Sequence, residues 1–80
     1  MRNDFDRPWA KGLRELIAVK LDLHGPLTTH EAAALCEVDV KAAAPRFSEL
    51  EQLGRVLDTG ERRSPTGKGR PQKVWKLTAP

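Results

Sequence analysis

The chain has 80 residues, with 14 Lys and Arg against 11 Asp and Glu, a formal net charge of +3 and a pI of about 9.4. This length supports one domain with a small core and is too short for a deep catalytic cleft. One cysteine cannot form an internal disulfide, and neither a basic leader nor an apolar run of ~18 residues is present. We therefore expect a single cytoplasmic domain over residues 1–80, with no membrane association.

Charge is distributed unevenly along the chain. Residues 1–54 hold seven Lys or Arg against nine Asp or Glu, whereas residues 55–80 hold seven against two. The positive potential is therefore expected on the C-terminal third.

The first expected element is an amphipathic helix over about residues 7–23. Its apolar residues recur every three or four positions, at Trp9, Leu13, Leu16, Ile17 and Leu21. Asp6 can cap its start, and Pro8 suits its first turn because no amide hydrogen is needed there. Trp9 is expected to pack in the core, with a contact between two copies as the alternative.

After an extended bridge over residues 26–28, a second helix is expected over about residues 29–37. Thr28 and Glu31 have the spacing of a capping box, in which each side chain accepts a hydrogen bond from the other's backbone amide. The helix body is rich in Ala and Leu, which are strong helix formers.

A third helix is expected over about residues 40–53. Asp39 can cap its start, and an apolar stripe follows at intervals of three and four, at Ala43, Phe47, Leu50 and Gly54. Gly54 also suits the left-handed position that ends a helix. Pro45 lies inside this helix and removes one backbone hydrogen bond, so we expect an irregular first turn over residues 39–44. Glu37 stands in the preceding turn where a glycine is common, so the turn must accept a strained residue or take another shape.

The C-terminal third predicts a hairpin. Residues 55–59 and 72–77 have the pattern of strands, and they flank a twelve-residue loop, GERRSPTGKGRP, with three glycines, two prolines and four basic residues. A long, exposed and positively charged hairpin tip is expected.

This order of elements resembles that of a winged helix-turn-helix domain. The resemblance is most specific in PRFSELEQLGRV, residues 45–56, which is similar to a recognition helix continuing through a Leu-x-x-x-Gly junction into the first wing strand. Thr66, Gly67 and Arg70 before an apolar strand look like the wings of small bacterial and phage regulators. The expected fold is mainly α with a small β-hairpin (α+β), a three-helix winged helix-turn-helix with its wing at about residues 55–77.

The resemblance implies double-stranded DNA as the partner, with the third helix in the major groove and the wing on the backbone. The expected function is that of a small, nucleoid-associated transcriptional regulator, a repressor or autoregulator of the kind that phages and mobile elements encode. No enzymatic activity and no cofactor are expected.

On the third helix, the candidate DNA contacts lie opposite the apolar stripe. Lys41, Pro45, Ser48 and Gln52 project to this side, where Lys41 and Gln52 can reach base edges or phosphates. An ordinary solvated face is the alternative for Ser48 and Gln52.

Arg46 sits at the flank of the stripe. It can bind a phosphate, which the resemblance favours, or form an ion pair with Glu49 or with a carboxylate of the first helix. Glu49 and Glu51 are expected to face away from the duplex because they would repel phosphates.

Thr28 and Thr29 open the second helix, where free amides and hydroxyls favour a phosphate. The alternative is that these threonines serve only as caps.

The wing candidates are basic residues that would bind phosphates without reading the base sequence: Arg62, Arg63, Lys68, Arg70 and Lys73. A basic loop that serves only solubility is the alternative.

Other functions find less support in the sequence. His24, His30 and Cys36 do not have the spacing of zinc ligands, and no phosphate-binding glycine loop or nucleophile elbow is present. A protein-binding adaptor, or an accessory factor of a replication or recombination complex, remains the alternative function. A homodimer is possible, without an extra helix dedicated to it.

Overall fold

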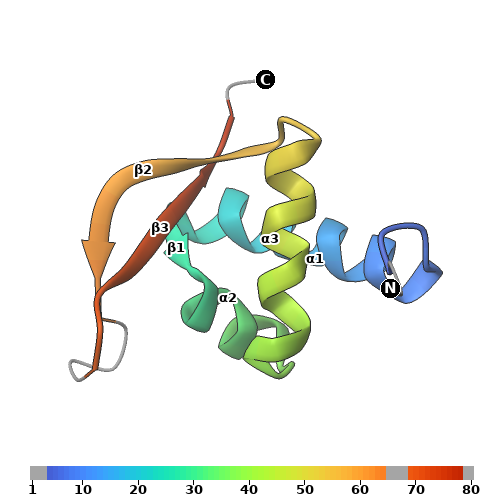
Figure 1. Cartoon of the computed structure of the whole chain (residues 1–80), viewed down its shortest axis with the longest axis horizontal. Helices are drawn as coiled ribbons and strands as arrows, with labels where there is room; N and C mark the ends of the chain where they lie inside the picture. The colour runs from blue at the N-terminus through green and yellow to red at the C-terminus, as the bar shows by residue number, and fades with distance from the viewer. Residues whose placement is uncertain (1–3, 65–68, 79–80) are drawn as a thin grey trace.

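The computed structural model describes residues 4–64 and 69–78. It contains, in chain order, α1 (Pro8–His24), β1 (Leu27–Thr28), α2 (Thr29–Cys36), α3 (Val40–Gln52), β2 (Val56–Arg63) and β3 (Gln72–Leu77). The strands form one antiparallel sheet in the order β1-β3-β2, and the sheet runs along one side of the three helices (Figure 1). The predicted winged helix-turn-helix fold is confirmed, and the bridge before α2 adds a short third strand to the hairpin.

The start of α1 differs from the prediction. Arg7, not Asp6, is the N-cap residue, and no side chain caps the helix. Pro8 occupies the first turn as expected, where its missing amide hydrogen costs nothing. Gly25 ends the helix at a φ of 80°, and its amide donates to the Leu21 carbonyl at 2.9 Å.

The start of α2 is the predicted capping box. The Glu31 amide donates to Thr28 Oγ1 at 3.1 Å, and the Thr28 amide donates to Glu31 Oε1 at 2.9 Å. The helix ends at Cys36, and the C-cap residue Glu37 adopts the left-handed conformation at a φ of 57°. The Val38 amide then bonds the Ala33 carbonyl at 3.0 Å, so the turn keeps the shape that glycine usually provides.

In α3 the predicted cap forms, because Asp39 Oδ1 accepts from the Lys41 amide at 2.7 Å. The irregular first turn expected over residues 39–44 is wrong: the helix is regular from Val40 through Pro45. Pro45 is the sixth helical residue, so the carbonyl left without its usual donor belongs to Lys41 in the exposed first turn. Water can satisfy that carbonyl, and the helix continues.

The strand β2 is longer than predicted. It continues past residue 59 to Arg63, and a bulge interrupts its pairing with β3 between Asp58 and Arg62. Gly60 lies inside this bulge at a φ of 87°, a conformation that glycine adopts without strain. The connecting loop therefore begins after Arg63 and not at Gly60. Residues 65–68 of that loop, including Lys68, lie outside the described residues.

The core lies between the helices and the sheet. Phe47, Leu50 and Ile17 are fully buried, and the rings of Phe47 and Trp75 pack with centroids 5.6 Å apart. Cys36 is buried, and burial raises the pKa of its thiol. The prediction that Trp9 packs in the core is wrong, because this residue is 52% exposed and lies outside the core. Within the described ranges, no helix has the length and apolar character needed to cross a membrane.

Candidate nucleic-acid interface

The outer face of α3 is open to solvent along its whole length. Lys41, Pro45, Ser48 and Gln52 are exposed and lie on the side away from Phe47 and Leu50. Ala44 and Glu51 are exposed at the edge of this surface, which corrects the expectation that Glu51 faces away from it. The four candidates predicted from the sequence therefore share one face, and their contact with DNA stays a prediction.

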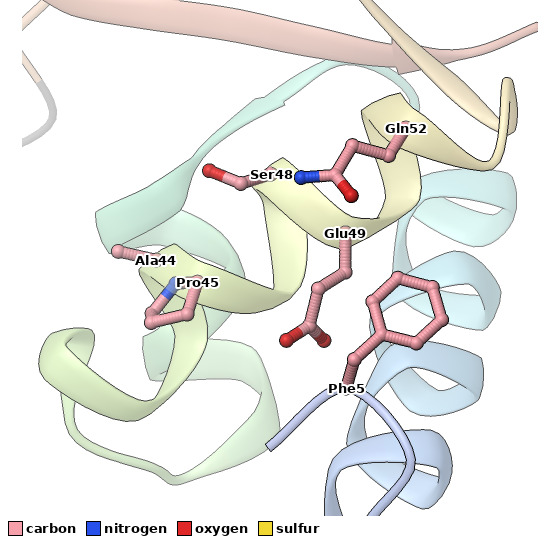
Figure 2. A pocket seen from close by; sticks show the side chains of 6 residues that line it. All are labelled: Phe5, Ala44, Pro45, Ser48, Glu49 and Gln52. Atoms are coloured by element: carbon pink, nitrogen blue, oxygen red, sulfur yellow. The ribbon is translucent and has the colours of Figure 1, made fainter. Parts of the chain in front are cut away.

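A shallow hollow of about 440 Å³ lies beside this face. Phe5, Ala44 and Pro45 provide apolar parts of its lining, while Ser48, Gln52 and Glu49 provide polar atoms (Figure 2). Phe5 was not among the candidates predicted from the sequence, because it lies before the first expected helix. The signal available was that Phe5 is a large aromatic residue in an otherwise polar terminus.

Under this face lies a cluster of charged side chains, which we call the α1–α3 junction: Arg14, Arg46 and Glu49. Arg46 donates to both carboxylate oxygens of Glu49, from Nε at 2.8 Å and from Nη2 at 2.9 Å. Arg14 Nη1 donates to Glu49 Oε1 at 2.5 Å. The three side chains are only 3–9% exposed.

Two aromatic rings cover the junction. The guanidinium carbon of Arg14 lies 4.5 Å from the Phe5 ring centroid, and that of Arg46 lies 4.7 Å from the Trp9 ring centroid. Each arginine thus has a carboxylate partner and an aromatic face, which compensates for its lost hydration. The contact with Arg46 explains the position of the Trp9 ring outside the core.

These contacts decide the role of Arg46. The phosphate-binding role favoured from the sequence requires an accessible guanidinium, whereas this one is buried and bidentate to Glu49. The ion pair considered as the alternative is the one that forms. Burial raises the pKa of Glu49, but hydrogen bonds from Arg46 and Arg14 outweigh burial and hold that pKa below its usual range. Glu49 therefore stays ionised and is neutralised from inside the protein.

The two threonines at the start of α2 differ in accessibility. Thr28 is fully buried, and its hydroxyl is occupied by the capping box. Thr29 is half-buried. Of the two, only Thr29 presents a side chain near the surface.

On the wing, two of the predicted arginines have protein partners. Arg62 pairs with both oxygens of Asp58, at 3.0 and 3.2 Å. Hydrogen bonds from the Gly60 amide and from Arg62 lower the pKa of Asp58. Arg63 donates to the Pro26 carbonyl at 3.0 Å and to Glu31 at 2.8 Å, which fastens the loop end of the hairpin to the segment before β1 and to α2.

The other described wing candidates are more accessible. Arg70 is exposed, with no ion-pair partner among the described residues. Lys73 is exposed, and its ammonium lies 5.6 Å from the Trp75 ring centroid. Lys41 on α3 likewise lacks an ion-pair partner within the part of the chain that the structure describes. Among the described DNA-contact candidates, the cations that are exposed and lack an ion-pair partner are therefore Lys41, Arg70 and Lys73.

The fold is similar to that of solved Zα domains. The Zα domain of Carassius auratus PKZ in complex with Z-DNA matches with a TM-score of 0.71 and 16% identity, over 88% of this chain and 98% of that chain. The apo Zα domain of zebrafish PKZ matches with a TM-score of 0.69 and 20% identity, over 86% and 95%. No family model and no curated protein matches the sequence. At these identities the likeness establishes the winged-helix fold.

Proposed function

We propose that this chain binds double-stranded DNA, with the outer face of α3 in the groove and the wing against the flanking backbone. The observation that carries the proposal is the composition of that face. Lys41 supplies a free cation, Ser48 and Gln52 supply neutral hydrogen-bonding groups, and Glu49 beside them is already neutralised. A duplex therefore meets one exposed carboxylate on this face, that of Glu51.

The residues divide into those that can read bases and those that can position the duplex. Gln52 has the amide that pairs with adenine in the major groove, and small apolar groups such as Ala44 suit a thymine methyl. Arg70 and Lys73 can bind phosphates, which adds affinity and salt dependence without base specificity. Bound in this way, the protein would act as a small regulator by occupying its site.

A left-handed duplex is the second candidate ligand. The solved structure of a similar fold, from Carassius auratus PKZ, holds Z-DNA. A winged helix can thus meet a duplex other than the right-handed form, and the handedness of the ligand is an experimental question for this chain.

The test is a fluorescence anisotropy titration of a labelled random duplex over a salt series. The variant Ser48→Glu/Gln52→Glu changes the net charge by −2 on the α3 face, and Lys11→Glu makes the same change at an exposed position on α1. We expect the first variant to lose at least about tenfold in affinity and the control to lose much less. Equal losses would contradict an interface on α3.

The wing and the handedness are tested with the same assay. Arg70→Ala/Lys73→Ala should reduce the slope of log K against log salt by about two, since each neutralised phosphate contributes roughly 0.9. An alternating dC-dG duplex held left-handed, with its handedness read by circular dichroism, separates the two ligands. If the wild type binds neither duplex at low salt, the proposal fails and the adaptor alternative gains support.

A further inference from the structure

The outer side of α1 carries an apolar stripe that stays largely exposed in the described fold, although the Trp9 ring at its N-terminal end also contacts Arg46 of α3. Trp9, Leu16, Val19 and Leu23 are 52, 39, 50 and 69% exposed. Gly12 lies between them, with open space where a Cβ would stand. We call these five residues the α1 stripe.

The α1 stripe lies opposite the side of α1 that packs on the core. The core side consists of Ala10, Arg14, Ile17, Ala18 and Leu21. At 3.6 residues per turn, the centres of the two sets lie about 160° apart around the helix axis. A surface helix with one partner is normally polar on this second side, so α1 has the composition of a helix with partners on both sides.

The spacing of the α1 stripe indicates what kind of partner fits. Its positions 9, 12, 16, 19 and 23 alternate steps of three and four residues, which is the seven-residue repeat of helices that pair along their length. A stripe of this kind is complementary to another copy of itself. Gly12 within it would allow close approach of two helix backbones.

The charges beside the stripe favour one orientation. Glu15 and Asp22 flank one edge, and Lys20 flanks the other. In a parallel pair, Glu15 of each copy lies opposite Lys20 of the other, five residues further along. An antiparallel pair would instead bring the acidic edges together. Glu15 already accepts a hydrogen bond from Arg55 at one oxygen, and its second oxygen can accept another.

We propose that two copies of this chain associate through the α1 stripe as a parallel, two-fold symmetric pair. The fold already holds α1 as a helix of 17 residues, so pairing does not require the costly nucleation of an isolated helix. Since Arg14 on the opposite side contacts α3, the pair leaves the outer face of α3 open. The proposal is independent of DNA binding.

The surface that the five residues of the α1 stripe can bury is small, so we expect a weak dimer with a dissociation constant on the order of 10 µM. Sedimentation velocity of the full chain from about 2 to 500 µM should show a rise from monomer to dimer mass around that value. Leu16→Glu/Val19→Glu should remain monomeric throughout. Leu35→Glu/Leu57→Glu places the same charges on exposed apolar residues elsewhere and should dimerise like the wild type.

Before sedimentation, circular dichroism should be used to check that each variant is folded. A wild type that is monomeric at the highest concentration overturns the proposal, as does a stripe variant that dimerises like the control.

A cross-linking experiment tests the orientation without disturbing the fold. In a Cys36→Ala background, Leu23→Cys should form a disulfide-linked dimer on mild oxidation, because residue 23 meets its own counterpart only in a parallel pair. Leu57→Cys in the same background is the control and should stay uncross-linked. A dimer that fails to cross-link at residue 23 contradicts the parallel pair.

Discussion

The α1–α3 junction and the wing use the same chemistry in different environments. At the junction, Glu49 is held between Arg14 and Arg46, and the side chains are 3–9% exposed. On the wing, Arg62 pairs with Asp58, and the side chains are 46% and 27% exposed. A buried pair cannot lose one partner without leaving an uncompensated charge, whereas an exposed pair in water contributes little.

The difference shows that a count of basic residues does not locate a binding surface. Arg46 is sequestered by its burial, although it lies on the helix that faces the proposed ligand. Arg62 can exchange Asp58 for a phosphate because both groups already reach water. Accessibility, not position along the chain, separates the structural arginines from those available to DNA.

The largest effect is expected from Glu49→Ala. This change leaves two buried guanidinium groups without their carboxylate, and removal of one partner from such a cluster typically costs 3–5 kcal/mol, so a loss of about 4 kcal/mol in the free energy of unfolding is expected. Urea denaturation measures it. Glu51→Ala, at an exposed position on the same helix, is the control and should change stability by less than about 0.5 kcal/mol. Similar values for the two variants would contradict the buried role of Glu49.

The second-largest effect is expected from acid, which should lower the stability that the α1–α3 junction contributes. The pKa of Glu49 is lowered by folding, so its contribution to stability is complete above the unfolded-state pKa of about 4.3 and is lost as the pH falls through the folded-state value. Urea midpoints between pH 7 and pH 2.5 should fall in the wild type below about pH 4 and fall less steeply in Glu49→Gln. Parallel curves would show that Glu49 does not cause the acid sensitivity.

A smaller effect is expected at the ring over Arg14. Phe5→Leu keeps an apolar side chain but removes the aromatic face that lies 4.5 Å from the guanidinium carbon. A loss of about 1 kcal/mol is expected in urea denaturation, in the range measured for cation–π contacts. In an Arg14→Met background the same change should cost clearly less. Equal costs in both backgrounds would contradict the contact.

The smallest effect on stability is expected on the wing. Arg62→Ala should leave the urea midpoint nearly unchanged, because the pair with Asp58 is exposed. In DNA binding the same variant should reduce the salt slope by up to about one. Asp58→Asn should strengthen DNA binding, since it releases Arg62 and removes a negative charge. A large loss of stability in Arg62→Ala would remove the distinction between wing and junction.

The helices and their order were predictable because their signals are local. The capping box at Thr28 and Glu31, the cap at Asp39 and the glycine after α3 each depend on residues within a few positions. The apolar stripe of α3 also set which of its side chains are exposed. Among the site candidates, Lys41, Ser48 and Gln52 could therefore be assigned to one surface from the sequence.

The errors arise where contacts distant in sequence decide the structure. Arg46 lies at the edge of the α3 stripe, and its role depends on Glu49 being shared with Arg14, 35 residues away from Glu49. The charges after residue 59 suggested a loop, but pairing with β3 extends β2 through Arg63. Trp9 continues an apolar periodicity, yet its ring covers Arg46 and stays half exposed. The pattern of neighbouring residues in the sequence does not show which distant residues will come into contact.

The most direct test of the proposed interface is a titration of the ¹⁵N-labelled protein with duplex DNA, followed by amide chemical shifts. We expect the largest changes on the outer face of α3 and on the wing, at Lys41, Ala44, Ser48, Gln52, Arg70 and Lys73. Amides of the α1 stripe, such as Leu16 and Val19, should change little at concentrations where the protein is monomeric. Changes confined to α1, or no changes at a duplex concentration that saturates other DNA-binding domains, would contradict the assignment of α3 and the wing as the nucleic-acid interface.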